Sequence, residues 1–593
     1  MAIVELKKLT LCGLLAEKTG VLKKLQSLGG SHLISLNKLL VSTEEASQKQ
    51  TEKAIQAVKY LNQCANKRHQ VHYDNTFDLD TVVQQVIQVQ ADIRTLSDQR
   101  DFLVSRIAEI KPWGDFDLKA DDDFGGIKCW FYIIPKRLMK DLDKELIFQL
   151  VHEDNIHCYV VILAEQEPAE SSVPVPRTHT GVVSLSKLIK QLQSVELDLE
   201  DKQAERASLT RWISLISLSL TQNKENAALQ LASSLTLDEH DLFVIQAWVP
   251  IKQLSAFQSF AKAEGLAMLI EEVTEQDRPP TLLENPDLLA GGEDVIKFYQ
   301  TPAYNSWDPS AVVFFSFAFF FAMILSDAGY AAIFGVLLAF KWKKLGRHTQ
   351  GKRLRLLAAV TVGFSIIWGV LTGGYFGYSP TPESIAGWFK ILDLNDFDSM
   401  MKLSIAIGVV HIILANLIKA YQLRAKKTAF AALGWVSLVS GGFLLWLAID
   451  NTLYTSYSLL IAGGLLVLFF SSERTINTSS DYLWQLLDGV KNITGVTKIF
   501  GDILSYMRLF ALGLASASLA LTFNQLAEQV YTSVTGLGLL LSILILLLGH
   551  TLNLVLCLMS GVVHGLRLNF IEFYSWSVSD EGYAFKEFSK KRK

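Results

Sequence analysis

Cysteine is scarce and scattered in this sequence of 593 residues. No CxxC pair occurs among the five cysteines, so neither a disulfide framework nor a zinc site is expected. They are Cys12, Cys64, Cys129, Cys158 and Cys557. The net charge of only −4 gives no sign of a nucleic-acid partner, and we expect none.

Signals for secretion and for nucleotide binding are also lacking. The one early apolar run, residues 9–16, is short, is bounded by Lys8 and Glu17, and has no small-residue cleavage site after it, so we expect the polar half to stay in the cytosol. Residues 346–352 match most of a phosphate-binding loop, but Arg353 stands where Ser or Thr would bind Mg²⁺, and no strand precedes it. We therefore expect no ATP site, cofactor or metal in this chain.

Long apolar runs are missing from the first half of the chain and dominate the second. We interpret residues 1–290 as a cytosolic arm, 291–310 as a linker and 311–593 as a transmembrane domain. The expected fold is an α-helical integral membrane protein with eight transmembrane helices. Its N-terminal arm would combine α/β lobes with an antiparallel coiled coil.

Two heptad seams occur in the polar half, at residues 79–110 and 185–220. Arg100 breaks the first, and Lys202 and Arg206 interrupt the second. Two seams of similar length predict either a hairpin within one chain or a parallel homodimer. We favour the hairpin because the segment between the seams has a globular pattern.

That intervening segment predicts a small α/β lobe, and its pattern recurs after the second seam. The expected elements are a strand at 129–134, a helix from about 136, a strand at 158–163, and then a strand at 242–249, a helix at 252–264 and a strand at 266–273. We therefore predict two lobes joined by the hairpin.

The membrane half contains apolar runs long enough to cross the ~30 Å hydrocarbon core. They are 311–340, 354–375, 403–418, 428–448, 455–471, 499–527 and 534–571. Asp327 interrupts the first run, and a basic cluster at 341–355 follows it. Two crossings of this run place every basic loop inside, whereas one crossing places them all outside. The sequence thus predicts eight spans with both termini in the cytosol.

The last two runs are too long for upright helices, since 499–527 would extend ~44 Å and 534–571 ~57 Å. We expect them to tilt or to project from the bilayer. Arg508 lies about nine residues into the first of them, on a helical face with Ser505. Because an arginine stays charged, it holds a fixed positive field there, or it forms a structural ion pair within the bundle.

A second polar stripe occurs on the last apolar run. Asn553, Ser560, His564 and Arg567 share one helical face, which suits a water-filled path. Glu572 lies off that face near its cytosolic end. If the helix stood upright, however, its crossing would finish near residue 555 and Arg567 would be an ordinary cytosolic anchor.

Two of these segments resemble a known family, the a subunit (subunit I) of V/A-type ATPases. Residues 502–512 (DILSYMRLFAL) resemble its seventh-helix motif, and residues 563–572 (VHGLRLNFIE) resemble its eighth-helix motif. Residues 326–330 (SDAGY) and 367–373 (IWGVLTG) resemble the first helical break and the third helix. The short length is similar to that of bacterial and archaeal forms.

The resemblance implies a static, non-catalytic membrane subunit of a rotary ATPase in the cell membrane. Arg508 and Arg567 would face the rotor ring, and Arg508 would separate two aqueous half-channels. The implied ion-translocation residues are Arg508, Arg567, His564, Glu572, Ser505, Ser560 and Asn553, with possible support from Asp502, Ser516 and Asp327. Implied partners are the rotor ring proteolipid subunits, peripheral stalk subunits, other V/A-ATPase subunits and the lipid bilayer.

Two positions depart from the family's pattern. Ser516 stands where the family often has His, and Ser326 where it often has Gly. The first change places a proton role at that position in doubt. The main alternative is a secondary transporter or channel with a cytosolic regulatory domain, although the eight predicted spans show no repeated halves. A membrane-anchored coiled-coil scaffold is a further alternative, but it leaves Arg508 unexplained.

Overall fold

The computed structural model divides the chain into two compact units. It describes residues 3–37, 44–116, 126–143, 145–169, 172–173, 175–178, 183–274, 276–447, 452–472, 474, 479–534, 536–578 and 580–590. The first unit comprises Met1–Val21, Leu28–Ile34 and Asp238–Ser589, and the second comprises Leu22–Ser27, Ser35–Leu237 and Lys590–Lys593.

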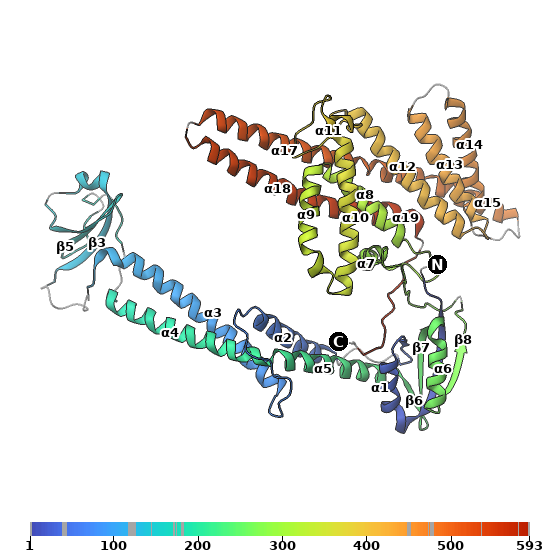
Figure 1. Ribbon diagram of the computed structural model, residues 1–593, viewed down its shortest axis with the longest axis horizontal. Helices are drawn as coiled ribbons and strands as arrows, with labels where there is room; N and C mark the ends of the chain where they lie inside the picture. The colour runs from blue at the N-terminus through green and yellow to red at the C-terminus, as the bar shows by residue number, and fades with distance from the viewer. Residues whose placement is uncertain are drawn as a thin grey trace. The chain divides into compact units, whose positions relative to one another are not determined.

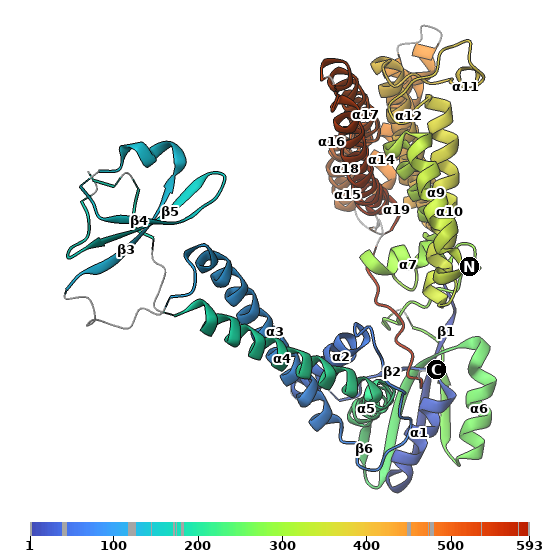
Figure 2. The same cartoon turned by 60° about the vertical axis from the view of Figure 1, so that its left-hand side comes forward.

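Two long helices of the second unit, α3 (Leu79–Ile110) and α4 (Leu185–Leu209), run antiparallel (Figure 2). Ile110 packs in one cluster with Leu188, and Lys202 Nζ lies 3.2 Å from an Asp92 carboxylate oxygen. Residues later in α4 therefore meet residues earlier in α3. These contacts join two segments of one chain, while the supercoiling of a coiled coil stays a prediction.

Both interruptions of the second seam have polar or aromatic partners. Lys202 pairs with Asp92 as described, and Arg206 donates to the Tyr60 carbonyl oxygen at 2.8 Å while its guanidinium lies 4.0 Å from the centre of the Tyr60 ring. Tyr60 belongs to α2 (Glu44–Asn62), which packs against α3 and α5 (Ile213–Leu235). The seam thus changes partner here from one helix to a small bundle.

A three-stranded antiparallel sheet lies between α3 and α4 in the sequence. Its strands β3 (Lys128–Pro135), β4 (Phe148–Glu153) and β5 (His157–Ala164) have the order β3-β5-β4. The helix expected from about residue 136 is only a 3₁₀ segment, Lys136–Asp141. Strand β4 escaped prediction because its side chains are all exposed and show no alternation.

The first unit contains a second antiparallel sheet in the order β2-β7-β1-β8, with β6 paired to β7. Its elements are β1 (Leu6–Leu14), α1 (Lys18–Leu28), β2 (His32–Ile34), β6 (Leu237–Glu239), β7 (Leu242–Pro250), α6 (Leu254–Ala263) and β8 (Ala267–Glu271). The early apolar run is therefore a central strand, in which Leu9 lies opposite both Ala247 and Ile270. We call this sheet with α6 the β1 lobe.

The C-terminal tail returns to the β1 lobe. Lys586 donates its backbone N–H to His32 Nδ1 at 2.8 Å, and Phe588 donates to the Ser31 carbonyl oxygen at 2.7 Å. Tyr304, which lies shortly before the first apolar helix, also contacts this lobe through its hydroxyl. Because the chain leaves and rejoins one lobe, any membrane crossings between these points must be even in number.

We expect this tail contact to weaken in acid. Partial burial, followed by the charge of Lys586, lowers the pKa of His32. A proton on His32 also abolishes the Nδ1 acceptor, so the state with the tail undocked, in which His32 binds protons more readily, gains population as the pH falls below ~6.5. Hydrogen exchange of the Lys586 amide should accelerate, beyond its intrinsic pH dependence, below that pH. His32→Asn keeps an acceptor without the titration and should remove the effect; an unchanged pH response in this variant would contradict the assignment.

The membrane half is helical. Its helices are α7 (Ala290–Tyr299), α8 (Ser310–Leu325), α9 (Ala328–Leu345), α10 (Thr349–Thr372), α11 (Ile385–Trp388), α12 (Phe397–Gln422), α13 (Thr428–Leu447), α14 (Leu453–Phe470), α15 (Ser479–Ile493), α16 (Gly495–Leu504), α17 (Met507–Ser533), α18 (Gly538–Arg567) and α19 (Tyr574–Ser577). Six helical stretches within the described residues are long and apolar enough to cross a membrane. Helix α8 is shorter, with 16 residues, and α9 has three lysines among its last five residues. The count of eight spans therefore stays a prediction.

The first apolar run breaks in its middle, between α8 and α9. Ser326 adopts a left-handed conformation with φ of 44°, and the Asp327 carboxylate caps α9 by accepting from the Tyr330 N–H at 3.0 Å. Its second oxygen accepts from the Gly377 N–H at 3.2 Å. Asp327 thus holds a helical break together, and both of its oxygens have backbone donors.

Helix α7 lies in the stretch predicted to be a linker. Its Glu293 is buried, with Lys297 Nζ at 2.5 Å and Arg353 Nη1 at 3.6 Å. Arg353 follows residues 346–352, which form the turn after α9 and the start of α10, so helix α9 precedes them where a phosphate-binding loop requires a strand. The arginine that replaces the expected Ser or Thr therefore serves in an ion-pair cluster.

Single-cysteine labelling should show the predicted topology. In a cysteine-free chain, cysteines at His348 and Ala425 should resist an impermeant reagent added outside, because both loops are basic. Cysteines at Asn395 and Thr452 should react. A reactive cysteine at position 348 would mean that α8 and α9 do not both cross.

Candidate functional site

The predicted ion-translocation residues lie on α17, α18 and the turns at their ends. The two long helices lie side by side (Figure 1). The sequence predicts one helix through Arg508, whereas the structure has a short turn at Ser505–Tyr506 between α16 and α17. Arg508 is therefore the second residue of α17, immediately after a break.

Three polar side chains meet at this break. Arg508 Nη2 donates to Ser505 Oγ at 2.7 Å, and Ser505 Oγ donates to Glu572 Oε1 at 2.5 Å. Since the serine hydroxyl has one proton, it can donate to the carboxylate while it accepts from the arginine. Ser505 thus relays between a cation and an anion that are 64 positions apart in sequence (572 − 508).

Glu572 reaches this position through a π-helical segment, Leu568–Phe573, that follows α18. In a π-helix the backbone hydrogen bonds link residues five apart. Glu572, the fifth residue after Arg567, therefore returns towards the face of the helix that carries Arg567. Arg567 Nε lies 3.9 Å from Glu572 Oε1. The expectation that Glu572 lies off the arginine face was therefore wrong, because it assumed an uninterrupted α-helix.

Burial differs sharply within this group. The Glu572 side chain is 4% exposed, whereas that of Arg567 is 50% exposed. Three buried atoms, Arg508 Nη1, Glu572 Oε2 and His564 Nδ1, have no hydrogen-bond partner within the described part of the chain. An unpaired buried polar atom costs ~1–3 kcal/mol. These three atoms are therefore open to water, an ion or a polar partner from outside the chain. We call Ser505, Arg508, His564, Arg567 and Glu572 the arginine cluster.

The turn before Arg508 is fixed from behind by aromatic packing. The Tyr506 hydroxyl lies 2.7 Å from His411 Nδ1 of α12, and both side chains are buried. The His411 ring stacks on Phe573, with 4.3 Å between the ring centroids. Asp502, one turn earlier, accepts from Trp576 Nε1 at 2.7 Å. These contacts join the break in α16–α17 to the π-helical segment that carries Glu572.

A second polar group lies further along α17 and α18. Asn553 Nδ2 donates to the Ser516 carbonyl oxygen at 2.9 Å and to the Tyr330 hydroxyl at 3.1 Å. The Ser516 and Cys557 side chains lie 2.8 Å apart, and the Cys557 Sγ is 3.5 Å from Asn553 Oδ1. The structure therefore brings Asn553 and Ser516 together, away from the arginine cluster.

The directions of the hydrogen bonds in this second group follow from Asn524, which lies at one end of the group. Asn524 Nδ2 donates to the Phe376 carbonyl oxygen, so its Oδ1 faces His550 Nε2 at 3.0 Å and accepts from it. A neutral His550 then accepts at Nδ1, and the Tyr330 hydroxyl is its donor at 2.7 Å. We call Tyr330, Ser516, Asn524, His550, Asn553 and Cys557 the outer polar group.

The remaining predicted residues lie near one of these two groups. Ser560 is half-buried, one turn before His564 on α18. Asp327 caps the helix that begins two residues before Tyr330. Tyr330, His411, His550 and Cys557 escaped prediction, since each has a partner on another helix. Among the described residues, no group of three His, Cys, Asp or Glu side chains could hold a metal ion.

One face of α17 beside Arg508 is exposed and made of small residues. Ala511, Ala515 and Ser518 are exposed and follow Arg508 at spacings of three and four. Small side chains allow another helix to approach closely within a membrane. This face could therefore take a partner helix with Arg508 at its edge.

Several known proteins that are similar to this chain are named subunit I of a V-type or an A-type ATP synthase. No family model matches. V-type ATP synthase subunit I of Chlamydia pneumoniae is 26% identical over 605 residues, which cover 87% of each protein. The subunit I of Borreliella burgdorferi is 26% identical and covers 100% of both chains. A-type ATP synthase subunit I of Methanocaldococcus jannaschii is 28% identical over 455 residues, with 68% of this chain and 64% of that protein covered.

Among solved structures, the following is 15% identical to this chain with a TM-score of 0.22: "Crystal structure of the cytoplasmic N-terminal domain of subunit I, homolog of subunit a, of V-ATPase". It covers 44% of this chain and 99% of that one. The matches to the Chlamydia pneumoniae and Borreliella burgdorferi proteins, in contrast, extend over most or all of this chain. The resemblance predicted from the two arginine motifs is thus confirmed: this chain is a homologue of subunit I of the V-type and A-type ATP synthases.

Proposed function

We propose that this chain is the static membrane subunit of a rotary V/A-type ATPase, and that it carries ions past a rotor ring between two half-channels. Its homologues bear the name of such a subunit. The observation that most supports an ion path is the arginine cluster, in which two arginines meet one buried glutamate at the end of a polar stripe. The chain itself would bind no ATP.

Two separate polar groups suit two half-channels. On α17, Arg508 and Ser516 are eight residues apart, or ~12 Å along a helix. The residues between them include the buried Leu509, Phe510 and Gly513. An apolar layer of this kind would keep water in one group from joining water in the other. An ion would then have to cross on the rotor.

The charges of the arginine cluster leave one positive charge in excess, since two arginines face one carboxylate. A rotor carboxylate that passes within ~4 Å of Arg508 would gain ~4 kcal/mol at an effective dielectric constant of about 20. Burial of an arginine costs ~2.5–3.5 kcal/mol on insertion scales. These terms are similar, so Arg508 would displace the ion from the carboxylate without trapping the rotor.

Glu572 would exchange the released ion with water at the cytosolic end of the path. Its Oε2 is buried and has no partner in the described residues, while its Oε1 is held by Ser505. Ser560 and His564 would line the path along α18. The outer polar group would form the other half-channel, with Asn553 and Ser516 at its inner end.

The polar N-terminal part would act as the cytosolic arm that anchors peripheral stalks. Helices α3 and α4 form its long element, and the β3–β5 sheet lies at one end of that pair (Figure 2). Tail contacts to the β1 lobe would keep both termini on one side of the membrane. We assign that side to the cytosol from the basic loops.

Purification of the complex tests this proposal. An affinity tag on this chain, with extraction in mild detergent, should recover a small apolar subunit that carries a membrane carboxylate, together with ATP-hydrolysing subunits. A complex with neither would favour the transporter or channel alternative. Purified alone, the chain should show no ATPase activity.

A further inference from the structure

Helix α15 has its polar face against the protein and its apolar face exposed. Asp481, Gln485 and Asp488 follow one another at spacings of four and three and share one side. Gln485 Nε2 donates to the Phe469 carbonyl oxygen at 2.6 Å, and Asp488 accepts from Ser472 Oγ at 2.9 Å. This side therefore packs on the end of α14, opposite to the arrangement of a water-soluble surface helix.

Close packing on the polar side has a steric cause. Gly489 is buried, and a Cβ at that position would lie 2.8 Å from the Leu468 carbonyl carbon. The glycine lets α15 contact the α14 backbone directly. Helix α15 is thereby held in one orientation, with its other side directed outward.

The outward side is a continuous apolar stripe. Leu483, Leu486, Leu487 and Val490 follow helical spacing, and their exposed fractions are 63%, 41%, 48% and 50%. Full burial of one such side chain is worth ~1.5–3 kcal/mol. Such a stripe requires an apolar environment outside the described chain.

Length shows that α15 is not needed to cross the bilayer. Helices α16 and α17 together span residues 495–533, or ~58 Å if upright, against ~30 Å of hydrocarbon. Helix α15 precedes them at the end of a candidate span, α14. A helix of this kind can lie in the plane of the membrane surface.

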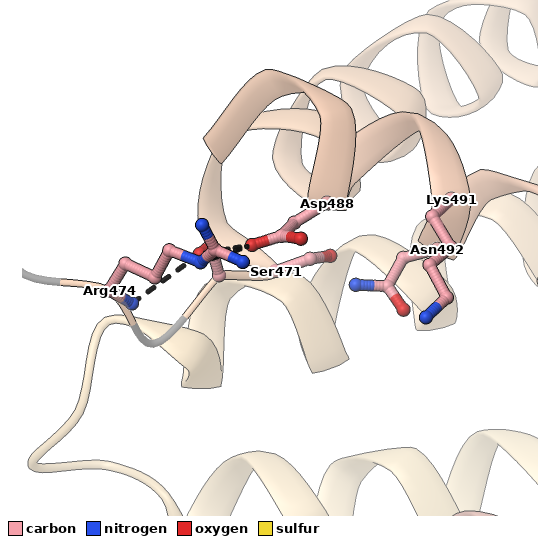
Figure 3. A pocket seen from close by; sticks show the side chains of 6 residues that line it. Ser471, Arg474, Asp488, Lys491 and Asn492 are labelled. Atoms are coloured by element: carbon pink, nitrogen blue, oxygen red, sulfur yellow. Dashed lines mark hydrogen bonds and ion pairs between the residues drawn. The ribbon is translucent and has the colours of Figure 1, made fainter. Parts of the chain in front are cut away.

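A polar pocket beside α15 offers charge for an anionic group (Figure 3). It is lined by Ser471, Ser472, Arg474, Asp488, Lys491 and Asn492. Arg474 Nε lies 3.1 Å from Asp488 Oδ2, while Lys491 and Asn492 line the pocket from the next turn of α15 (Figure 3). Among the described residues that line the pocket, two cations and one carboxylate leave one positive charge, together with hydroxyl and amide donors. A phosphate diester, with one negative charge and only acceptor oxygens, matches this set.

We propose that α15 is an interfacial helix whose apolar stripe lies in the lipid, and that the adjacent pocket binds the phosphate of an anionic phospholipid. The acyl chains would run along Leu483 and Leu487. Trp484, beside Arg474, would anchor the helix at the headgroup level, since its ring lies 5.5 Å from the guanidinium carbon. This site is independent of the arginine cluster.

Depth-dependent fluorescence quenching tests the orientation. In the full chain without its native cysteines, an environment-sensitive dye at Leu487→Cys should be quenched by nitroxide-labelled lipids in phosphatidylcholine nanodiscs. The matched control is Val104→Cys on α3, also an exposed apolar residue on a helix, which should stay unquenched. If position 487 is quenched no more than position 104, the stripe binds another protein and the proposal is overturned.

Lipid retention tests the pocket. Native mass spectrometry of the solubilised full chain should show preferred retention of phosphatidylglycerol over phosphatidylcholine. The double variant Arg474→Gln/Lys491→Gln should lose that preference by about tenfold, while Arg424→Gln/Lys427→Gln, which removes two cations from another loop, should keep it. Equal loss in both variants would show general charge attraction only. Displacement of phosphatidylglycerol by inorganic phosphate would show a free-anion site; either result refutes the lipid site.

Discussion

The variant Arg508→Gln should assemble normally and lose coupled ion transport, with ATP-driven uptake into vesicles lowered about a hundredfold or more. Glutamine can still donate to Ser505 but provides no charge. The lost attraction between Arg508 and a rotor carboxylate is worth ~4 kcal/mol at a separation of ~4 Å. Since each tenfold change in a rate corresponds to ~1.4 kcal/mol, this loss is large enough for a decrease of a hundredfold or more. Arg508→Lys should also lose most of the uptake. In arginine, Nη2 of the planar guanidinium binds Ser505 while Nη1 stays available for the rotor carboxylate, and a lysine ammonium lacks this geometry.

A matched control for this variant is Arg424→Gln. Arg424 is exposed in a basic loop, over the Tyr421 ring and outside both polar groups. It should retain near-normal uptake. Subunit composition of each purified complex shows whether assembly is intact. An assembled Arg508→Gln complex with near-normal uptake would contradict the electrostatic role of this arginine.

Glu572→Gln should have the second-largest effect, with uptake lowered about tenfold. The amide keeps the size of the side chain and an acceptor for Ser505, but removes the negative charge. Arg567 lies 3.9 Å from this carboxylate and is half-exposed, so solvent screening reduces the interaction to the order of 1–2 kcal/mol. The variant should also leave two unbalanced positive charges that hold the rotor carboxylate more tightly.

The variant Ser505→Ala distinguishes an effect of the charge of Glu572 from an effect of the position in which Ser505 holds it. It leaves both charges but removes the hydroxyl that bridges them. We expect an intermediate loss of uptake. If Glu572→Gln transports normally while Ser505→Ala does not, Glu572 acts only as a structural acceptor and the proposed exchange role is wrong.

The sequence signals that succeeded are local ones. Heptad spacing predicts residues 79–110 as one helix, and α3 has these bounds because Asp78 caps it and Pro112 follows it closely. Asp327 similarly interrupts an apolar run, and the structure breaks there between α8 and α9. Each signal depends on residues within a few positions of one another.

Features that escaped prediction depend on distant partners. Strand β1 becomes central because it pairs with β7, more than 200 residues later (242 − 14 = 228). The place of Glu572 depends on a π-helical segment, and that of Arg508 on a turn fixed by His411 of α12. The spacing rules for an ideal α-helix describe neither the π-helical segment nor this turn. The sequence therefore identifies the two arginines but not their contacts with Ser505 and Glu572.

Cross-linking from the face of α17 around Arg508 tests most directly whether this arginine faces the rotor. A photoreactive amino acid at Ala511, which is exposed one turn after Arg508, should cross-link to the small carboxylate-bearing subunit of the ring in the assembled complex. The same probe at Ile367 of α10, which is 61% exposed, should label lipid only. A cross-link from position 511 that contains lipid alone would contradict a rotor-facing Arg508.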